Sequence, residues 1–455
     1  MNMNSSKNFL VPFILLIFLI GVSFGAKSQQ VYFNNIYDYF GNQETAFSVL
    51  AVNGGYYIAG AAKDSSTWQR IEILYIDSLG NEIWKKSYGK QGHQYYPGIG
   101  GSFISTFDGG YALGGSVLKP TGDSDAMLYK FDSNGDTLWT RTYGDSLFQI
   151  VYKCQQTNDG GYILVGAANN GADSDVLLIK TDANGYIEWQ QTYGGSNNQT
   201  GITIDVCIDQ GYIIGGSTWS VLTGYDAHII KTDNMGNQQW TQTFGDDYDD
   251  CGGNIIQTMD NGYIFSICIN QLVPPNLNPN FTRNHIYKLD SLGMVVWTRP
   301  FGPLTQGGGN SFNSEFHELS DGSFFIAGQL IDAQLAMRGW LLKISAQGDS
   351  LWDRRYDRFD ESDDRFLNAI PTDDGGFIAV GDNYYYGVND TGILADNRQN
   401  LWVLKIDSCG CAYSGCDTTC TGNTTYIADF VMSNFQFEIY PNPASENVII
   451  SYSIP

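Results

Sequence analysis

Residues 157–194 read TNDGGYILVGAANNGADSDVLLIKTDANGYIEWQQTYG, and they contain one complete copy of the pattern that predicts the fold. The copy begins with a D-G-G-Y turn that ends at Tyr162 and continues with the pattern K-x-D-x-x-G-x-x-x-W, which ends at Trp189. Short apolar segments bounded by Gly, Asp and Asn lie around these turns, as is typical of strands. This stretch therefore encodes two tight turns and the strands that they join.

The D-G-G-Y turn, with some variation, occurs seven times along the chain. Its aromatic residue stands at Tyr56, Tyr111, Tyr162, Tyr212, Tyr263, Phe324 and Phe377. The second pattern recurs in phase with the turn, and its tryptophans are Trp84, Trp139, Trp189, Trp240, Trp297 and Trp352. The last copy, over residues 405–410, has no tryptophan and runs into a cysteine cluster, so we expect the array to end there.

A period of roughly 50 residues with four short strands in each unit predicts an all-β fold, a β-propeller of seven four-stranded blades, with six or eight blades as alternatives. The continuously apolar segment 176–179 fits a strand that is covered on both faces. We expect residues 31–40 to supply the first strand of the first blade and residues 401–406 the last strand of the array. The propeller then occupies residues 29–407.

Each repeated residue has a structural role in this interpretation. Glycine permits the positive φ of a tight turn, aspartate or asparagine bonds to its own backbone, and tryptophan fills the space between blades. The D-x-x-G-x-x-x-W spacing resembles the tryptophan-docking repeat of the quinoprotein (PQQ-type) propellers over most of residues 31–407. That family includes dehydrogenases that use pyrroloquinoline quinone and calcium. The adjacent cysteine pair of many such enzymes is absent here, so the resemblance supports the fold and not the activity.

The N-terminus predicts export. Lys7 precedes an apolar run over residues 9–24, and Ala26 and Ser28 form a small-residue cleavage pattern, so we expect residues 1–28 to be a signal peptide that is removed. A membrane anchor is the alternative for this run. We expect no transmembrane segment after removal of the signal, and a protein that is extracellular or at the outer-membrane surface. The formal net charge of −24 argues against nucleic acid as a partner.

Residues 437–446, FEIYPNPASE, precede an apolar strand and resemble the opening of the type A C-terminal sorting domain of type IX secretion in Bacteroidetes. The sorting motif would be Tyr440, Pro441, Asn442 and Pro443. The resemblance implies the type IX secretion machinery as a partner and a small C-terminal β-sandwich that starts within residues 431–455. We expect this sandwich to be incomplete, because the sequence stops at Pro455.

Four cysteines lie in the expected linker over residues 408–430, namely Cys409, Cys411, Cys416 and Cys420. Their spacing lacks the C-x2-C pairs that zinc sites favour. In an exported chain such a cluster is a set of disulfide candidates.

The connections of a four-stranded meander lie alternately on two faces of the ring. The D-G-G-Y and D-x-x-G turns share one face, here named the turn face. The opposite face, the loop face, receives the long insertions 271–282, 302–310 and 383–398. Because binding often resides in loops on a rigid scaffold, we expect a glycan or protein ligand on the loop face. The candidate binding aromatics there are Trp68, Trp219, Tyr384, Tyr385 and Tyr386, with packing of their own loops as the alternative role.

Acidic residues also gather in the expected loops. Asp123, Asp125, Asp173 and Asp175 are candidate calcium ligands, because calcium prefers carboxylate and carbonyl oxygens. None of these segments reproduces a D-x-D-x-D-G loop, so solvated acidic loops are the alternative. We expect no other cofactor.

The catalytic residues, if any, stay unknown. The chain has no H-E-x-x-H, G-x-S-x-G or G-x4-G-K-[ST] motif, which argues against zincins, serine hydrolases of the nucleophile-elbow type and P-loop enzymes. The sequence favours a non-catalytic binding propeller whose ligand is a glycan, a peptide or a surface protein. A secreted polysaccharide-active enzyme and a structural surface module are alternatives. A carboxylate pair across the mouth of the central channel would favour the enzyme, and an aromatic strip without such a pair would favour binding.

Overall fold

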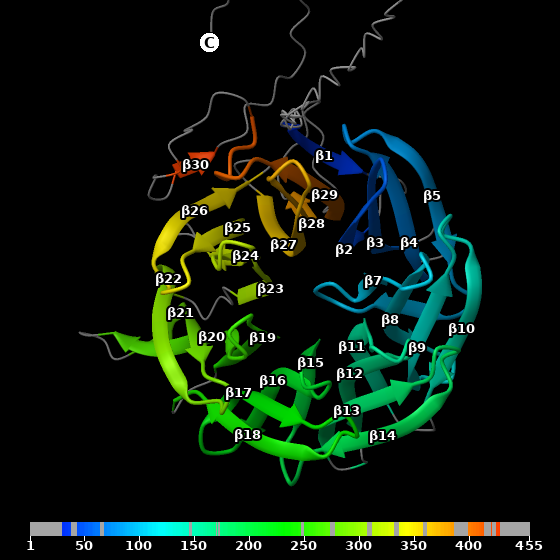
Figure 1. Ribbon diagram of the computed structural model, residues 1–455, viewed down its shortest axis with the longest axis horizontal. Coiled ribbons are helices and arrows are strands. Elements are labelled where there is room, and N and C mark those ends of the chain that lie inside the picture. The colour runs from blue at the N-terminus through cyan, green and yellow to red at the C-terminus, as the bar shows by residue number, and fades with distance from the viewer. Residues whose placement is uncertain are drawn as a thin grey trace, which may run out of the picture.

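The computed structural model describes residues 30–427 except for 38–42, 64–67, 145–147, 170, 172, 247–249, 274–277, 307–311, 332–335, 358–361, 386–398, 414–419 and 421–424. All regular secondary structure in this part of the chain is β. The strands form seven sheets that stand as blades around a central axis (Figure 1). The prediction of a seven-bladed propeller is therefore confirmed.

Four of the blades are single runs of four antiparallel strands. Blade 1 contains β2 (Glu44–Val52), β3 (Gly55–Lys63), β4 (Gln69–Asp77) and β5 (Glu82–Tyr88). Blade 3 contains β11 (Gln149–Gln156), β12 (Tyr162–Asn169), β13 (Ser174–Thr181) and β14 (Ile187–Tyr193). Blade 4 contains β15 (Gln199–Val206), β16 (Tyr212–Ser220), β17 (Gly224–Thr232) and β18 (Gln238–Phe244). Blade 5 contains β19 (Cys251–Gln257), β20 (Tyr263–Val273), β21 (Asn278–Leu289) and β22 (Val295–Gln306).

Two blades depart from this plan. The inner strand of blade 2 is split, so the blade contains β6 (Gln94–Pro97), β7 (Phe103–Ser105), β8 (Tyr111–Leu118), β9 (Ser124–Phe131) and β10 (Thr137–Tyr143). Blade 6 contains β23 (Phe312–Glu318), β24 (Phe324–Ile331), β25 (Met337–Ile344) and β26 (Ser350–Tyr356), and a fifth strand, β30 (Thr425–Ile427), pairs in parallel with β26.

The N-terminal strand closes the ring. Blade 7 contains β27 (Ser362–Pro371), β28 (Phe377–Tyr385), β29 (Gln399–Ile406) and, as its outermost strand, β1 (Phe33–Tyr37). The expectation that residues 31–40 form the first strand of blade 1 is wrong, because β2 takes that place. Phe33 and Tyr37 have the spacing of Trp84 and Tyr88 in the outer strand of blade 1, and this spacing fits β1 to the same position in blade 7.

Neighbouring blades are joined by the tryptophan of one blade and the D-x-x-G turn of the next. An ideal Cβ placed on Gly185 in blade 3 would lie 2.6 Å from the ring of Trp139 in blade 2, and the glycine has a φ of 76°. Only glycine meets both conditions. Tyr143 then donates a hydrogen bond of 2.8 Å to the Gly185 carbonyl. The predicted role of tryptophan between the blades is confirmed by this contact.

A buried lysine ties the two turns of a blade together. The Lys130 ammonium lies 2.9 Å from the Asp108 carboxylate of the D-G-G-Y turn and also donates to the Phe131 carbonyl. Equivalent ion pairs join Lys180 to Asp159, Lys231 to Asp209, Lys288 to Asp260, Lys343 to Asp321 and Lys405 to Asp374. In blade 1 both partners are replaced, by Asn53 and Tyr75.

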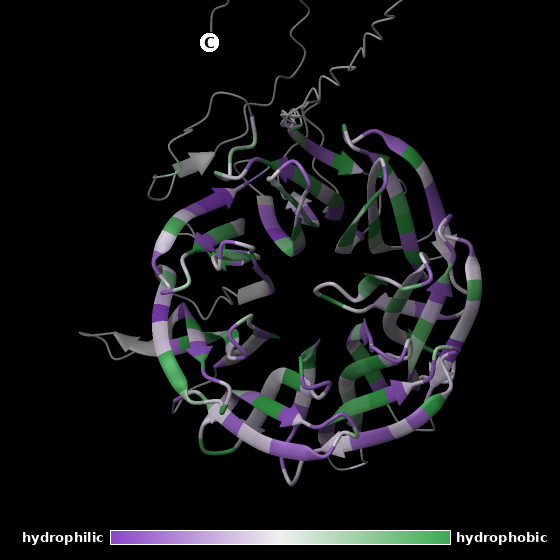
Figure 2. Ribbon diagram, viewed as in Figure 1, coloured by the Kyte–Doolittle hydropathy of each residue, from purple (hydrophilic) through white to green (hydrophobic). Residues whose placement is uncertain are grey.

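In blade 3 burial is greatest in the two middle strands and least in the outermost strand. Strand β13 ends in six buried residues, whereas β14 is mostly exposed. Figure 2 shows the same gradient, with hydrophobic residues on the inner strands and many hydrophilic ones on the outermost strands. Within the described residues, no helix has the length and apolar character needed to cross a membrane.

The first of the three expected insertions, 271–282, is mostly strand. Residues 271–273 continue β20 and residues 278–282 belong to β21, so blade 5 has an extended hairpin where we expected a loop. The prolines and asparagines of this segment interrupt the alternation of apolar and polar residues that is typical of a strand, so the sequence did not predict the longer hairpin. The other two insertions are described only up to Gln306 and Tyr385.

Candidate functional site

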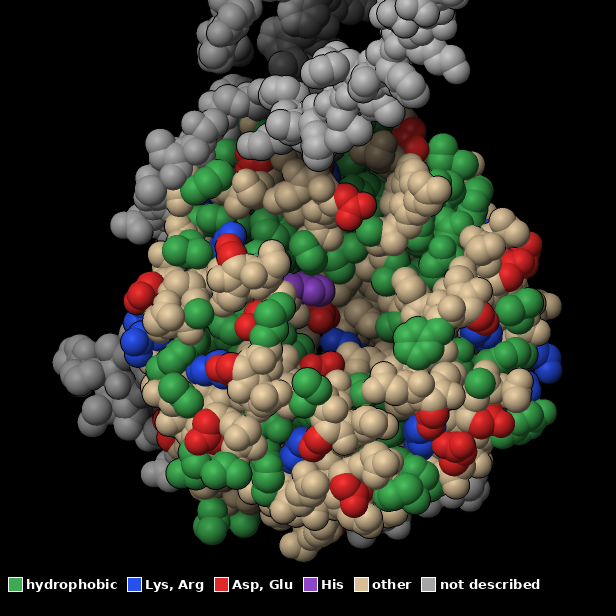
Figure 3. All heavy atoms as spheres, in the orientation of Figure 1, with side chains coloured by type: hydrophobic (Ala, Val, Ile, Leu, Met, Phe, Trp, Pro, Cys, Tyr) green, Lys and Arg blue, Asp and Glu red, His purple; other side chains and the backbone are tan. Residues whose placement is uncertain are grey.

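The central channel is closed near its middle by an ion pair. The Lys153 ammonium on β11 of blade 3 lies 3.2 Å from Glu315 Oε1 on β23 of blade 6, and their side chains are only 6 and 8% exposed. Asn368 on β27 of blade 7 donates to the other oxygen of Glu315 at 3.3 Å. Figure 3 shows acidic, basic and histidine side chains close together near the centre of the ring. Because a buried charge needs a partner, this pair fixes blades that are not neighbours.

A segment within the split inner strand of blade 2 reaches this ion pair. Residues 98–102 leave the strand between β6 and β7, and a Cβ on Gly101 would lie 3.2 Å from Glu315 Oε2. The segment is anchored by hydrogen bonds from the Gly98 backbone N–H and the Ser102 hydroxyl to the Gly114 carbonyl. A hollow lies on each face of the ring.

The first hollow, here named the turn-face mouth, has a volume of about 520 Å³. Its lining comes from blades 3 to 6 and includes Lys153, Gln155, Asp205, Ile208, Gln257, Met259, Glu315, His317 and Glu318. His317 donates from Nε2 to the Ala369 carbonyl at 2.7 Å in the arrangement expected of a neutral ring, and burial lowers the pKa of this histidine.

Acidic side chains of the turn-face mouth hold backbone groups of the neighbouring blade. Asp205 accepts hydrogen bonds from the Gln257 backbone N–H at 2.8 Å and from Gln155 Nε2 at 3.2 Å. Burial raises the pKa of Asp205. Glu318 accepts the backbone N–H of Met259 at 2.6 Å. These carboxylates therefore have structural roles as well as a place at the rim of the hollow.

The second hollow, here named the aromatic pocket, lies on the loop face and has a volume of about 350 Å³. Its lining includes Phe47, Tyr96, Pro97, Ile99, Leu118, Phe148 and Tyr152 from blades 1, 2 and 3. Tyr96 and Phe148 are 40 and 46% exposed at its rim. Among its few polar groups, the Ser116 hydroxyl already accepts the Val151 backbone N–H. The pocket therefore offers aromatic surface and few free hydrogen-bonding groups.

The predicted binding aromatics do not form this pocket. Trp219 lies near the end of β16 in blade 4, Tyr384 lies in β28 of blade 7, and Trp68 directly precedes β4 of blade 1. Blade 4 stands across the ring from blades 1 and 7, so Trp219 is not brought together with the other two. The backbone of Tyr385 ends β28, and Tyr386 lies outside the described residues.

A signal in the sequence could have located the aromatic pocket. The stretch from Gln94 to Thr106 is four residues longer than its counterpart from Gln149 to Thr157. This extra length splits the inner strand of blade 2 and places Tyr96 and Ile99 at the channel. The extra residues lie within a strand and not in a connection between strands, so they do not stand out as a long loop.

The predicted calcium ligands fall into two groups. Lys119 lies between Asp123 and Asp125, with Nζ–O distances of 2.8 and 2.7 Å, so an ammonium already occupies the place of a cation between them. Asp175 is pressed against Gly194 between blades 3 and 4, and Asp173 lies just before β13. Within the described residues, no three His, Cys, Asp or Glu side chains are grouped so as to hold a metal ion.

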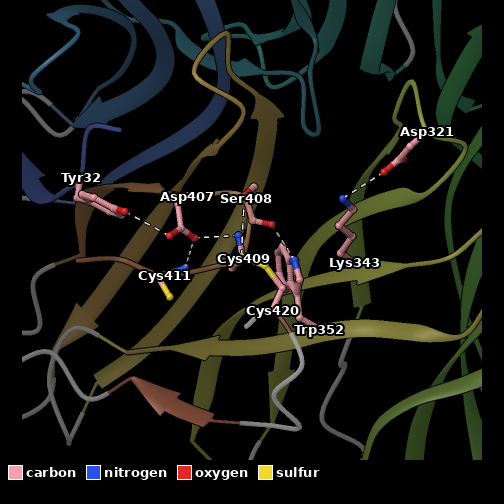
Figure 4. The surroundings of a disulfide bond; sticks show 9 residues. All are labelled: Tyr32, Asp321, Lys343, Trp352, Asp407, Ser408, Cys409, Cys411 and Cys420. Carbon is pink, nitrogen blue, oxygen red and sulfur yellow. Dashed lines mark hydrogen bonds and ion pairs between the residues drawn. A yellow bond between two sulfur atoms is a disulfide. The ribbon is translucent and has the colours of Figure 1, made fainter. Parts of the chain in front are cut away.

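The cysteine cluster lies against blade 6 (Figure 4). Cys409 and Cys420 are joined by a disulfide, and Cys411 is also disulfide-bonded. Trp352 donates from Nε1 to the Ser408 carbonyl at 3.0 Å, which anchors this turn to the blade. Cys416, the predicted signal peptide over 1–28 and the predicted sorting motif at 440–443 lie outside the described residues.

Comparisons with known proteins add only a general likeness of shape. No family model matches the chain, and no curated protein matches it. Solved structures similar to it include the WD40 domain of Toxoplasma gondii coronin, with 10% identity and a TM-score of 0.46, where the match covers 83% of this chain and 85% of that one. Another is BBS1N in complex with ARL6DN, with 10% identity, a TM-score of 0.43 and coverage of 83 and 97%. A puromycin hydrolase mutant complexed with PGG has 12% identity and a TM-score of 0.42, and the match covers 78% of this chain and 52% of that one.

Proposed function

We propose that this chain is an extracellular, non-catalytic binding propeller that holds an apolar segment of a peptide or surface protein in its aromatic pocket. The observation that carries the proposal is the pocket itself, with Tyr96 and Phe148 partly exposed on the loop face. Partly exposed aromatic side chains on a rigid scaffold are typical of ligand sites. The hydrogen-bonded sheet of each blade and the Lys153–Glu315 ion pair in the channel supply that rigidity.

The lining of the pocket favours an apolar ligand over a sugar. A sugar ring brings many hydroxyl groups, and each must find a hydrogen-bonding partner when it leaves water. The Tyr96 hydroxyl already donates to Gln94 Oε1 at 3.1 Å, and the Ser116 hydroxyl is engaged by backbone. A glycan is the second candidate, because the open faces of Tyr96 and Phe148 could stack on a sugar ring.

The arrangement at the channel supports binding over polysaccharide cleavage. Glycoside hydrolysis generally uses two carboxyl groups that face each other across the scissile bond. In the turn-face mouth Glu315 is paired with the ammonium of Lys153. The other two carboxylates there, Asp205 and Glu318, are held by backbone N–H groups of blade 5. The Lys153–Glu315 ion pair therefore holds blades 3 and 6 together.

Export belongs to the same proposal. The apolar N-terminal run and the Y-P-N-P motif support secretion through the type IX machinery, and the Cys409–Cys420 disulfide suits an oxidising compartment. Calcium binding at Asp173 and Asp175 is also a proposal. It is tested by repeating each binding measurement with EDTA.

The test is a screen of the purified protein on a random-peptide array and on a glycan array. We expect apolar peptides to bind, and Tyr96→Ala and Phe148→Ala to weaken their binding at least about tenfold, since truncation of an aromatic anchor typically costs 2 kcal/mol or more. Trp219→Ala on blade 4 is the matched control and should leave binding unchanged.

Three outcomes would contradict the proposal. Loss of binding in the Trp219 variant alone would move the site away from the aromatic pocket. Selective glycan binding would replace the apolar ligand by the second candidate. Release of shorter sugars from any bound glycan would make the protein an enzyme.

A further inference from the structure

The turn face carries large apolar side chains that its turns do not require. Phe107, Ile208 and Met259 are 71, 78 and 68% exposed, and each directly precedes the aspartate of a D-G-G-Y-type turn. Asn158 and Ser320 occupy this position in blades 3 and 6. A polar residue therefore serves the turn equally well, and the exposed apolar residues in blades 2, 4 and 5 need another reason.

These side chains stand on turns that are held in place. The backbone N–H of Phe107 donates to Gln156, that of Ile208 to Gln257 and that of Met259 to Glu318, at 2.8, 2.7 and 2.6 Å. Each acceptor comes from the inner strand of the following blade. Because the turns are already ordered, little conformational entropy would be lost when a partner covers them.

A second set of exposed apolar residues lies on the D-x-x-G turns of the same face. It comprises the third residue of three D-x-x-G turns, with exposed fractions of 61, 57 and 73% for Leu79, Met235 and Leu292. Large apolar side chains repeated over one face of a protein are a common feature of interaction surfaces. The turn face thus has an apolar surround and, at its centre, the turn-face mouth.

The mouth has an excess of negative charge. Asp205, Glu315 and Glu318 line it together with one ammonium, that of Lys153, which Glu315 already neutralises. The hydrogen bonds that Asp205 and Glu318 accept come from neutral donors, the backbone and the Gln155 amide. The lining therefore holds three carboxyl groups and one ammonium, so acidic groups are in excess even though the attraction of Lys153 also reaches Asp205.

We propose that the turn face is a second docking surface, and that it binds a segment of a partner protein in which a basic side chain stands between apolar residues. The basic group would enter the mouth beside Asp205 and Glu318, and the apolar residues would cover Ile208 and Met259. A wholly apolar segment would bury the two carboxylates without a partner, which is costly, and an acidic segment would be repelled. This surface lies opposite the aromatic pocket, so the chain could join two partners.

The experiment is a random-heptapeptide array probed with the purified protein and with two variants. We expect enrichment of peptides that contain Arg or Lys flanked by apolar residues. Their binding should fall at least about tenfold in Glu318→Gln, because loss of one partner from a largely desolvated charge pair has at least that effect. Binding of these peptides should also weaken when NaCl is raised from 50 to 500 mM, because salt screens the attraction between the basic group and the carboxylates. Ile208→Ser should weaken the same peptides through lost apolar contact.

The Glu318→Gln variant is designed to keep the fold. Gln257 already performs the same task for Ile208 with an amide oxygen, so the new amide can still accept the Met259 N–H. An unchanged melting temperature checks this point. Tyr96→Ala serves as the control and should leave these peptides unaffected, which separates this site from the aromatic pocket.

Enrichment of acidic or uncharged peptides, or no enrichment at all, would overturn the proposal. So would equal binding of the basic peptides by the wild type and by Glu318→Gln.

Discussion

Asp226→Asn should reduce the pH dependence of stability between pH 5 and 8. Asp226 on β17 and Asp250, directly before β19, are buried between blades 4 and 5. A Cβ on Gly245 would lie 1.9 Å from Asp226 Oδ1 and 2.9 Å from Asp250 Oδ2, so these two oxygens are neighbours. Burial raises the pKa of both groups, and with the charges of Asp246 and Asp226 it raises the pKa of Asp250 to about 7.

The magnitude follows from the difference between the folded and unfolded states. An aspartate in an unfolded chain has a pKa of about 3.9, and each pKa unit corresponds to about 1.4 kcal/mol. Full ionisation of Asp250 would therefore lower the free energy of unfolding by about 4 kcal/mol, and solvent screening reduces this to on the order of 2 kcal/mol. Because the folded protein holds the proton more tightly, the stability is complete below about pH 4 and is lost as the pH rises through about 7.

The asparagine variant supplies a donor where the wild type has a second carboxylate. Asp250 would keep the backbone hydrogen bonds from Asp246 and Asn270, at 2.9 and 2.7 Å, and its ionised form would gain the new amide. The two preceding junctions between blades already have an amide side chain in place of one of the two carboxylates. Gln149 and Gln199 stand five residues after the equivalent glycine, where blade 5 has Asp250.

The assay is denaturant unfolding followed by tryptophan fluorescence at pH 5, 6, 7 and 8. Asp125→Asn is the matched control in blade 2, where it should destabilise the protein at every pH because it breaks the 2.7 Å ion pair with Lys119. If the wild type and Asp226→Asn lose stability in parallel as the pH rises, the Asp226–Asp250 pair does not titrate in this range and the reasoning fails.

Three further results are expected from the repeat contacts. In denaturant unfolding, Trp139→Ala should cost about 3 kcal/mol through loss of the contact with the next blade, whereas Tyr143→Phe should cost about 1 kcal/mol for one hydrogen bond. By the same measurement, Asp108→Ala should cost more stability than Lys130→Met. Asp108→Ala leaves the buried Lys130 ammonium without its partner, whereas Lys130→Met leaves only the Asp108 carboxylate, which is 60% exposed. Deletion of residues 30–37 should lower the melting temperature and raise light scattering, because it opens the edge of β29.

The part of the fold that rests on local chemistry could be predicted from the sequence. The D-G-G-Y and D-x-x-G turns form through bonds within a few residues, as when Asp132 Oδ1 accepts the backbone N–H groups of Asn134 and Asp136. Their period then gives the number of blades. The expectation for the first strand was wrong, because β1 and β29 pair over a separation of about 370 residues. The local signal of an outer strand here is only the spacing of Phe33 and Tyr37, which matches that of Trp84 and Tyr88.

The candidate sites were harder to predict, because they exist only once the ring is closed. Lys153 and Glu315 are 162 residues apart and meet across a channel that neither blade forms alone. The aromatic pocket likewise combines Phe47 of blade 1, Tyr96 of blade 2 and Phe148 of blade 3. Each residue looks ordinary in its own repeat. Only their shared position relative to the axis brings them together.

A repeat fold provides its own controls, since seven copies meet nearly the same physical demands. Where most copies agree, as at the glycine beneath each tryptophan, the fold accounts for the residue. Where a copy departs without loss of the fold, the departure needs a separate cause. Asp250, where three earlier junctions have Gln94, Gln149 and Gln199, is a departure of this kind, and it leaves a cost, a pair of buried carboxylates. Such costs, and not the length of the loops, identify where this propeller departs from what its fold alone requires.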